Sequence, residues 1–182
     1  MPPSLPRERR VDSLTALNAR VEERSGELSL RVFVCGPNPT SVLTDEGRMA
    51  AEVRQYVSDK LEKIGYTVVW GEHRSFTEPT GLRQLKSFDD AAREILYANE
   101  EADCVIIFPA SPGSFAELGG FGMHTNIPQK LLVIFNSRHK NGGGFLVGGI
   151  ARTAKARNAK VWFRNYEKNI SFSRPSRQIS RK

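Results

Sequence analysis

Short apolar runs alternate along this chain with segments of helical periodicity. The apolar runs are of strand length and lie at residues 28–35, 66–70, 103–109, 130–135 and 160–163. The segments between them keep apolar side chains three or four positions apart, which predicts helices at residues 44–64, 87–101, 114–124 and 145–156. Strands that alternate with helices in this way predict an α/β fold, a parallel sheet with helices on both faces.

Right-handed crossovers favour the strand order 2-1-3-4-5 for a five-stranded parallel sheet, as in flavodoxin-like and Rossmann-like folds. In that order the ligand crevice lies at the carboxyl ends of the first and third strands, where the order of the strands reverses. The loops at this point are residues 36–38 and 111–114. We therefore expect the functional residues in or beside these two loops.

The ends of the chain differ in composition from its middle. Residues 1–10 are rich in proline and arginine and are predicted to be disordered, and residues 11–27 are predicted to contain an N-terminal helix. The domain itself is expected to span residues 28–164. Residues 165–182 are predicted to form a basic, flexible tail.

The positive charge of the chain is concentrated near its end. The net charge is +7, but residues 152–182 hold ten lysines and arginines against one acid, so the rest of the chain carries −2. A basic segment can contact nucleic acid, an acidic partner or a membrane surface, or it can simply be solvated. A nucleic acid bound through the tail is one expected partner, and the solvated tail is the alternative.

Other features of the sequence favour a cytoplasmic protein without a membrane anchor. It has no run of about 18 apolar residues and no apolar stretch of a secretory signal at its start. The two cysteines, Cys35 and Cys104, lie in apolar runs and are expected to be reduced thiols of the core. They lack the spacing of metal ligands, and we predict neither a metal nor a cofactor.

The turn Ser111-Pro112-Gly113-Ser114 opens the helix after the third strand. Ser114 is predicted as the N-cap of this helix, which places Glu117 at the third helical position. Two uses of Glu117 follow from this spacing. Its carboxylate can complete a capping box with Ser114, or it can point into the crevice and attack or stabilise an oxocarbenium-like centre at C1 of a sugar.

Four motifs in this order, RVFVCGP, EADCVIIF, SPGSFAELGGF and KLLVIF, resemble the nucleoside 2-deoxyribosyltransferase-like superfamily. The turn before the helix is most similar to that of the anti-phage branch, which includes retron-associated effectors. The resemblance implies that Glu117 is the catalytic nucleophile. It also implies substrate-binding roles for the residues of the first strand and the two loops: Phe33, Gly36, Pro37, Asn38, Ser111, Gly113 and Ser114.

The sequence departs from this superfamily in its other catalytic positions. Phe33 stands where active transferases carry an aromatic hydroxyl, and Ser111 stands where they carry an aspartate. The acid that would protonate a leaving base is not identified. The nearest acids before the third strand are Glu94, Glu100 and Glu101, and Asp89 and Asp90 lie earlier.

Four further polar residues are candidates for a role in the site. Asp103 lies at the amino end of the third strand, far from the crevice, and is expected to be structural. His73, His124 and His139 lack metal-spaced partners and are expected to be surface or loop histidines. His73 lies in the loop after the second strand, beside the crevice, where the neighbouring Arg74 could pair with a phosphate.

These features together predict an N-glycosidase that cleaves the base–sugar bond of a nucleoside, a nucleotide or an NAD-like molecule. The alternatives are a nucleotide-sensing module without turnover and an adaptor of the same fold that binds nucleic acid or a partner protein. Related transferases complete their sites from a neighbouring subunit, so the resemblance also implies a homo-oligomer.

Overall fold

A computed structural model describes residues 29–40, 44–71, 90–142 and 144–171 of the 182-residue chain. Its five strands are all parallel and form one sheet: β1 (Arg31–Cys35), β2 (Thr67–Trp70), β3 (Cys104–Ile107), β4 (Leu131–Asn136) and β5 (Lys160–Arg164). Their order is β2-β1-β3-β4-β5, which confirms the predicted topology. The predicted N-terminal segments, residues 1–10 and 11–27, lie outside the described residues.

Within the described residues, helices follow all five strands. They are α2 (Asp45–Lys63), α3 (Asp90–Glu100), α4 (Pro112–Met123), α5 (Arg152–Ala156) and α6 (Tyr166–Ser171), with a π-helical segment (Phe145–Ala151) and two 3-10 turns (Pro128–Lys130 and Ser137–His139). Within the described ranges, no helix has both the length and the apolar character needed to cross a membrane.

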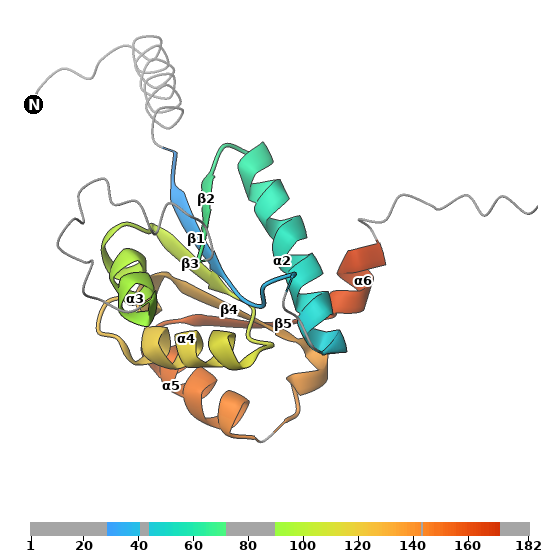
Figure 1. Ribbon diagram of the computed structural model, residues 1–182. Helices are drawn as coiled ribbons and strands as arrows, with labels where there is room; N and C mark the ends of the chain where they lie inside the picture. Colours follow the sequence, from blue (N-terminus) through green and yellow to red (C-terminus); the bar gives the residue numbers. More distant parts are fainter. Residues whose placement is uncertain (1–28, 41–43, 72–89, 143, 172–182) are drawn as a thin grey trace, which may run out of the picture.

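The sheet is covered on both faces, as its nearly continuous apolar strands predict. Side chains of Phe33, Val105 and Val133 pack on one face with residues of α3, α4 and α5, whereas Val34 and Ile106 pack on the other face with α2 and α6. Figure 1 shows these two helical layers with the sheet between them. The carboxyl ends of β1 and β3 therefore emerge between α2 on one side and α4 on the other.

Residues 166–171, which the sequence placed in the flexible tail, form helix α6 against the sheet. The Tyr166 side chain is fully buried, and its hydroxyl donates a hydrogen bond of 2.6 Å to the carbonyl of Ile134 in β4. Tyr166 also lies edge-on to Phe108, with 6.5 Å between the ring centroids. The folded domain thus continues past residue 164. Residues 172–182, the rest of the predicted tail, lie outside the described part of the chain.

Candidate active site

The loop after β1 bounds the crevice and depends on a glycine. Gly36 has a φ of +148°, and a Cβ at this position would lie 3.1 Å from Cβ of Phe108 and 3.2 Å from its carbonyl oxygen. Only glycine fits this backbone without strain. Pro37 is buried. Asn38 closes the loop, because its Oδ1 accepts two hydrogen bonds from Thr40, one from the amide at 2.9 Å and one from the hydroxyl at 2.7 Å.

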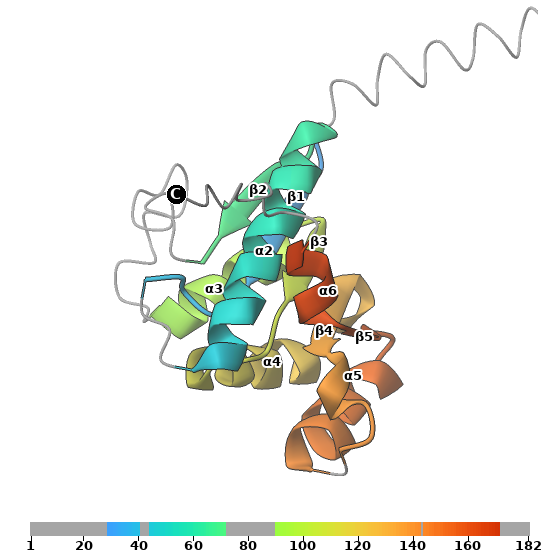
Figure 2. The same cartoon turned by 90° about the vertical axis from the view of Figure 1, so that its right-hand side faces the viewer.

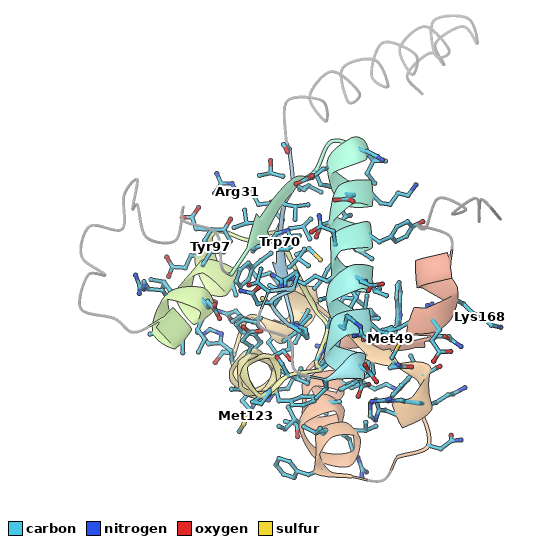
Figure 3. The ribbon with its side chains drawn as sticks, turned by 45° about the vertical axis from the view of Figure 1, so that its right-hand side comes forward. Arg31, Met49, Trp70, Tyr97, Met123 and Lys168 are labelled. Atoms are coloured by element: carbon cyan, nitrogen blue, oxygen red, sulfur yellow. The ribbon has the colours of Figure 1, made fainter. Side chains whose placement is uncertain are left out.

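A buried arginine of α2 holds this loop from below. Arg54 is fully buried, and its guanidinium donates to the carbonyls of Val34, Gly36 and Pro37 at 2.9, 3.0 and 3.2 Å. The guanidinium also lies 4.4 Å from the ring centroid of Trp70, beside α2 in Figure 3. Arg54 therefore ties α2 to the carboxyl ends of both β1 and β2.

Sequence reasoning missed Arg54, although the sequence holds a signal for it. Arg54 follows Val53 directly and lies four residues after Ala50, on the side of α2 that faces the sheet. A charged residue within the apolar stripe of a helix is rarely buried unless it has partners. Such a residue therefore marks a specific contact.

Helix α4 begins three residues earlier than predicted. Its N-cap is Ser111, whose Oγ accepts from the amide of Ser114, and Pro112 and Gly113 are the first two helical residues. Ser114 is the third, and its Oγ accepts from the Ser111 amide at 2.9 Å, which completes a capping box between the two serines. The predicted box between Ser114 and Glu117 is therefore wrong, and Glu117 lies in the second turn of α4.

Glu117 projects from α4 toward the sheet face that contains Phe33. It lies four residues before Phe121, so both side chains share one face of the helix. Phe121 is fully buried, and its ring centroid is 6.2 Å from that of Phe33 in β1. Glu117 lies one helical turn nearer the carboxyl edge of the sheet and is half-buried, with its Oε2 atom inaccessible to solvent.

A second carboxylate reaches the same region from α3. A Cβ on Gly71, the residue that follows β2, would lie 2.7 Å from Oε1 of Glu94 and 3.9 Å from Cζ of Phe33. Tyr97, one turn after Glu94, lies edge-on to Phe33 with 5.2 Å between the ring centroids. The Glu94 carboxylate is therefore placed at the carboxyl end of β2, near the tip of the Phe33 ring.

Helices α3 and α4, which carry the two acids, pack directly against each other. A Cβ on Gly120 would lie 3.2 Å from Cδ1 of Ile95, so the glycine lets the helices approach each other. Glu94 and Glu117 thus come from neighbouring helices, each of which packs an aromatic side chain against Phe33. The sequence named Glu94 as one of three nearby acids, but only the packing of α3 distinguishes it from Glu100 and Glu101.

A separate ionic cluster lies where β4 ends and α2 begins. Glu46 pairs with Arg138 through Oε2 and with Nε2 of His139 through Oε1, the latter at 2.6 Å. His139, predicted to be a surface or loop histidine, therefore joins the loop after β4 to the first turn of α2.

Tyr166 of α6 lies within the influence of the Glu46 charge. Burial, and secondarily this charge, raises the pKa of the Tyr166 phenol far above its usual value.

The remaining candidates lie away from Phe33 or outside the described residues. Asp103 accepts a 2.7 Å hydrogen bond from the amide of Arg31 at the amino end of the sheet, which confirms its structural role. His124 forms the C-cap of α4, and its Nδ1 accepts from the amide of Asn126. His73 and Arg74 are not among the described residues. Within the described ranges, no cluster of three or more His, Cys, Asp or Glu is placed to hold a metal ion.

Comparison with known proteins adds two findings. Residues 53–181 match the family described as STM3845 retron effector protein, and this match covers most of the domain. The chain is also similar to an Escherichia coli protein named "Retron Ec86 putative ribosyltransferase/DNA-binding protein", with 39% identity over 61 residues. This second match covers 34% of the present chain and 20% of the E. coli protein.

Proposed function

Because the chain belongs to the STM3845 retron effector family, we propose that it acts in anti-phage defence by cleaving an N-glycosidic bond. The substrate would be a nucleoside, a nucleotide or an NAD-like molecule. What supports this proposal is the half-buried Glu117 of α4, together with Glu94 of the neighbouring helix α3 at the carboxyl end of β2. The printed name of the E. coli relative, "putative ribosyltransferase/DNA-binding protein", supports a reaction at a bond to a sugar.

In the first step the Glu117 carboxylate attacks C1 of the sugar. The bond from C1 to the base nitrogen breaks, and its electron pair leaves with the base, while Glu117 becomes esterified to the sugar. A half-buried position between α4 and the sheet suits this role, because the attacking oxygen is held by a rigid helix. The Phe33 ring is fully buried against Tyr97 and Phe121, so in this mechanism it supports the site from beneath and does not itself contact the sugar.

In the proposed mechanism Glu94 is the proton donor that the sequence left unidentified. Its carboxyl group gives a proton to the leaving base, which avoids expulsion of a base anion. In the second step the Glu94 carboxylate takes a proton from water as the water oxygen attacks C1. Glu117 is released, and the products are free base and free sugar or sugar phosphate.

The test is the release of free base from purified protein. The protein is incubated with a panel of nucleosides, deoxynucleotides and NAD, and the products are separated by chromatography. Glu117→Gln should lower the rate by roughly a thousandfold or more, since it removes the nucleophile. Glu94→Gln should lower it by about 10²–10⁴-fold, the usual contribution of a general acid.

Glu100→Gln is the matched control for Glu94→Gln, because Glu100 lies on the same helix and is exposed. It should retain full activity. Release of base that survives Glu117→Gln would rule out Glu117 as nucleophile. Equal losses in Glu94→Gln and Glu100→Gln would remove Glu94 from the mechanism.

One observation favours a nucleotide sensor as the second candidate function. Phe33 is fully buried among Tyr97 and Phe121 and carries no hydroxyl, in contrast to the superfamily that the motifs resemble. A sensor would bind a nucleotide, detectable by calorimetry, without releasing base from any substrate in the panel. Binding without release would therefore favour the sensor over the glycosidase.

A further inference from the structure

Strand β5 forms an outer edge of the sheet and presents a basic aromatic face. Among the described residues it pairs only with β4, through Trp162 opposite Ile134 and its neighbours. Because side chains alternate along a strand, Lys160, Trp162 and Arg164 share one face, and all three are exposed. We call these three residues the β5 strip. The strand lies between α6 and α5 (Figure 2).

Trp162 is the central residue of the β5 strip. Its side chain is 46% exposed, although Val161 and Phe163 on the opposite face pack against the core. The guanidinium carbon of Arg164 lies 5.0 Å from the Trp162 ring centroid. A large aromatic ring at an open sheet edge promotes aggregation, so its presence there favours a binding role over a packing role.

The charge around the β5 strip suits a polyanion. Lys160 and Arg164 are both exposed, and α6, which packs on the same side of the sheet, adds the exposed Lys168 and the acid Glu167. Lys160 and Arg164 lie on either side of Trp162, about 13 Å apart at the rise of an extended strand. The strip therefore combines one stacking surface with two flanking cations.

We propose that the β5 strip binds single-stranded nucleic acid. An unstacked base can lie on the Trp162 ring or on the guanidinium plane of Arg164, and Lys160 can neutralise a neighbouring phosphate. A duplex keeps its bases stacked on one another and cannot offer them to the ring. The geometry therefore favours a single strand over a double helix.

The β5 strip is separate from the candidate active site. Strands β3 and β4 lie between β1 and β5, so about 14 Å of sheet separates the two at the usual strand spacing. A strand bound along β5 leaves the end of β1 open. Binding at the strip is thus testable whether or not the crevice is catalytic.

Lysine and arginine on an edge strand can also serve only to prevent edge-to-edge pairing. That role requires the two charges but not the exposed tryptophan. The two explanations differ in measurable ways. Edge protection predicts that the charge variants aggregate, whereas the binding role predicts that Trp162 and Lys160 variants bind nucleic acid more weakly.

The test uses the full chain and a fluorescein-labelled 15-nucleotide oligothymidylate, with binding followed by fluorescence anisotropy at 50, 100 and 200 mM salt. Trp162→Ala should weaken binding roughly 5- to 150-fold, the range for one stacking platform. Trp162→Phe should retain most of the affinity. Lys160→Ala should reduce the salt dependence of log K by about 0.7, the value for one phosphate contact to a single strand.

Lys63→Ala is the matched control, since it also removes one exposed lysine, from the last turn of α2 at a distance from β5. It should bind the oligonucleotide like the wild type. Affinity unchanged within twofold in Trp162→Ala would overturn the proposal, as would equal effects of Lys160→Ala and Lys63→Ala. Tighter binding of a 15-base-pair duplex, or aggregation of the variants without loss of binding, would also overturn it.

Discussion

Gly71 is the residue at which a single added methyl group should disturb the candidate site most directly. In Gly71→Ala the new Cβ would lie 2.7 Å from Oε1 of Glu94, so the carboxylate must move away. If Glu94 donates the proton, kcat/KM for base release should fall by up to about 100-fold, the effect of a misplacement near 1 Å. The thermal unfolding midpoint should change little, because the clash is with the end of a flexible side chain.

Gly119→Ala in α4 is the matched control for Gly71→Ala, because it also adds one methyl group to a glycine. A Cβ at Gly119 meets no atom within 4 Å, and the residue lies inside α4. Alanine should stabilise the protein by about 0.5–1 kcal/mol in urea unfolding, because glycine loses more backbone entropy in a helix. A Gly71→Ala variant as active as the wild type would mean that the position of Glu94 does not matter to the reaction.

Tyr166 makes the stability of the protein sensitive to alkaline pH. Burial, with a smaller contribution from Glu46, raises the pKa of its phenol in the folded state above the ordinary value of 10. Above pH 10 the unfolded chain loses this proton while the folded chain keeps it, so the free energy of unfolding should fall as pH rises. Below pH 10 the group contributes no pH dependence.

Urea unfolding of wild type and Tyr166→Phe at pH 9 and pH 11 checks this expectation. Tyr166→Phe should cost about 1 kcal/mol at pH 9, because it leaves the Ile134 carbonyl without its donor. It should also lose less stability than the wild type between the two pH values. Some loss should remain, since burial also raises the pKa of Tyr97. Equal losses in both proteins would contradict the assignment.

The sequence predicted the strand order that places the two loops at one edge of the sheet, but it misjudged where α4 begins. Ser111 and Ser114 are both good N-caps, and the proline at position 112, a residue preferred at the first helical position, was the signal that favoured Ser111. Glu94 could not be singled out, because its place beside Gly71 depends on how α3 packs against a distant strand.

At the scale of single elements, α2 is joined to the end of β1 by the hydrogen bonds of Arg54. Arg54→Ala should destabilise the protein by about 3–5 kcal/mol, because three carbonyls of the β1 end and its loop lose their donor. Arg48→Ala on the same helix removes only an exposed pair with Asp45 and should cost less than about 1 kcal/mol. The two free energies of unfolding are measured by urea titration.

A difference of under 1 kcal/mol between these two arginine variants would show that Arg54 does not hold the loop. Arg54→Lys separates charge from geometry. Lysine keeps the positive charge but not the planar fork of donors, so it cannot reach all three carbonyls at once. It should recover only part of the lost stability.

The strands were the elements that the sequence predicted most directly. Each strand of the sheet interior is apolar nearly throughout, which a strand covered on both faces requires, and the order of strands followed from the handedness of crossovers. Helix α6 was missed, because a six-residue segment between polar residues has too little periodicity to reveal it. Its position depends on the burial of one side chain, Tyr166.

At the scale of the whole molecule, α6 should count as part of the folded domain. A chain ended after Arg164 should be less stable than one ended after Ser171, by about 3 kcal/mol. This estimate combines the burial of one aromatic side chain with one buried hydrogen bond. Both chains lack residues 172–182, so the difference in urea unfolding reports α6 alone. Equal free energies of unfolding would mean that residues 165–171 do not belong to the folded domain.

The position of β1 in the middle of the sheet also affects how the protein is made. β1 pairs with β3 through Val32 opposite Cys104, so this partner is synthesised about 4 to 14 seconds after β1 at ordinary rates of translation. Until then the β1 edge that β3 will cover stays open on the ribosome. Helix α4, which carries Glu117, is the next element after β3, so it can pack on the sheet only once β3 has paired with β1. A chain released before that point carries no assembled crevice.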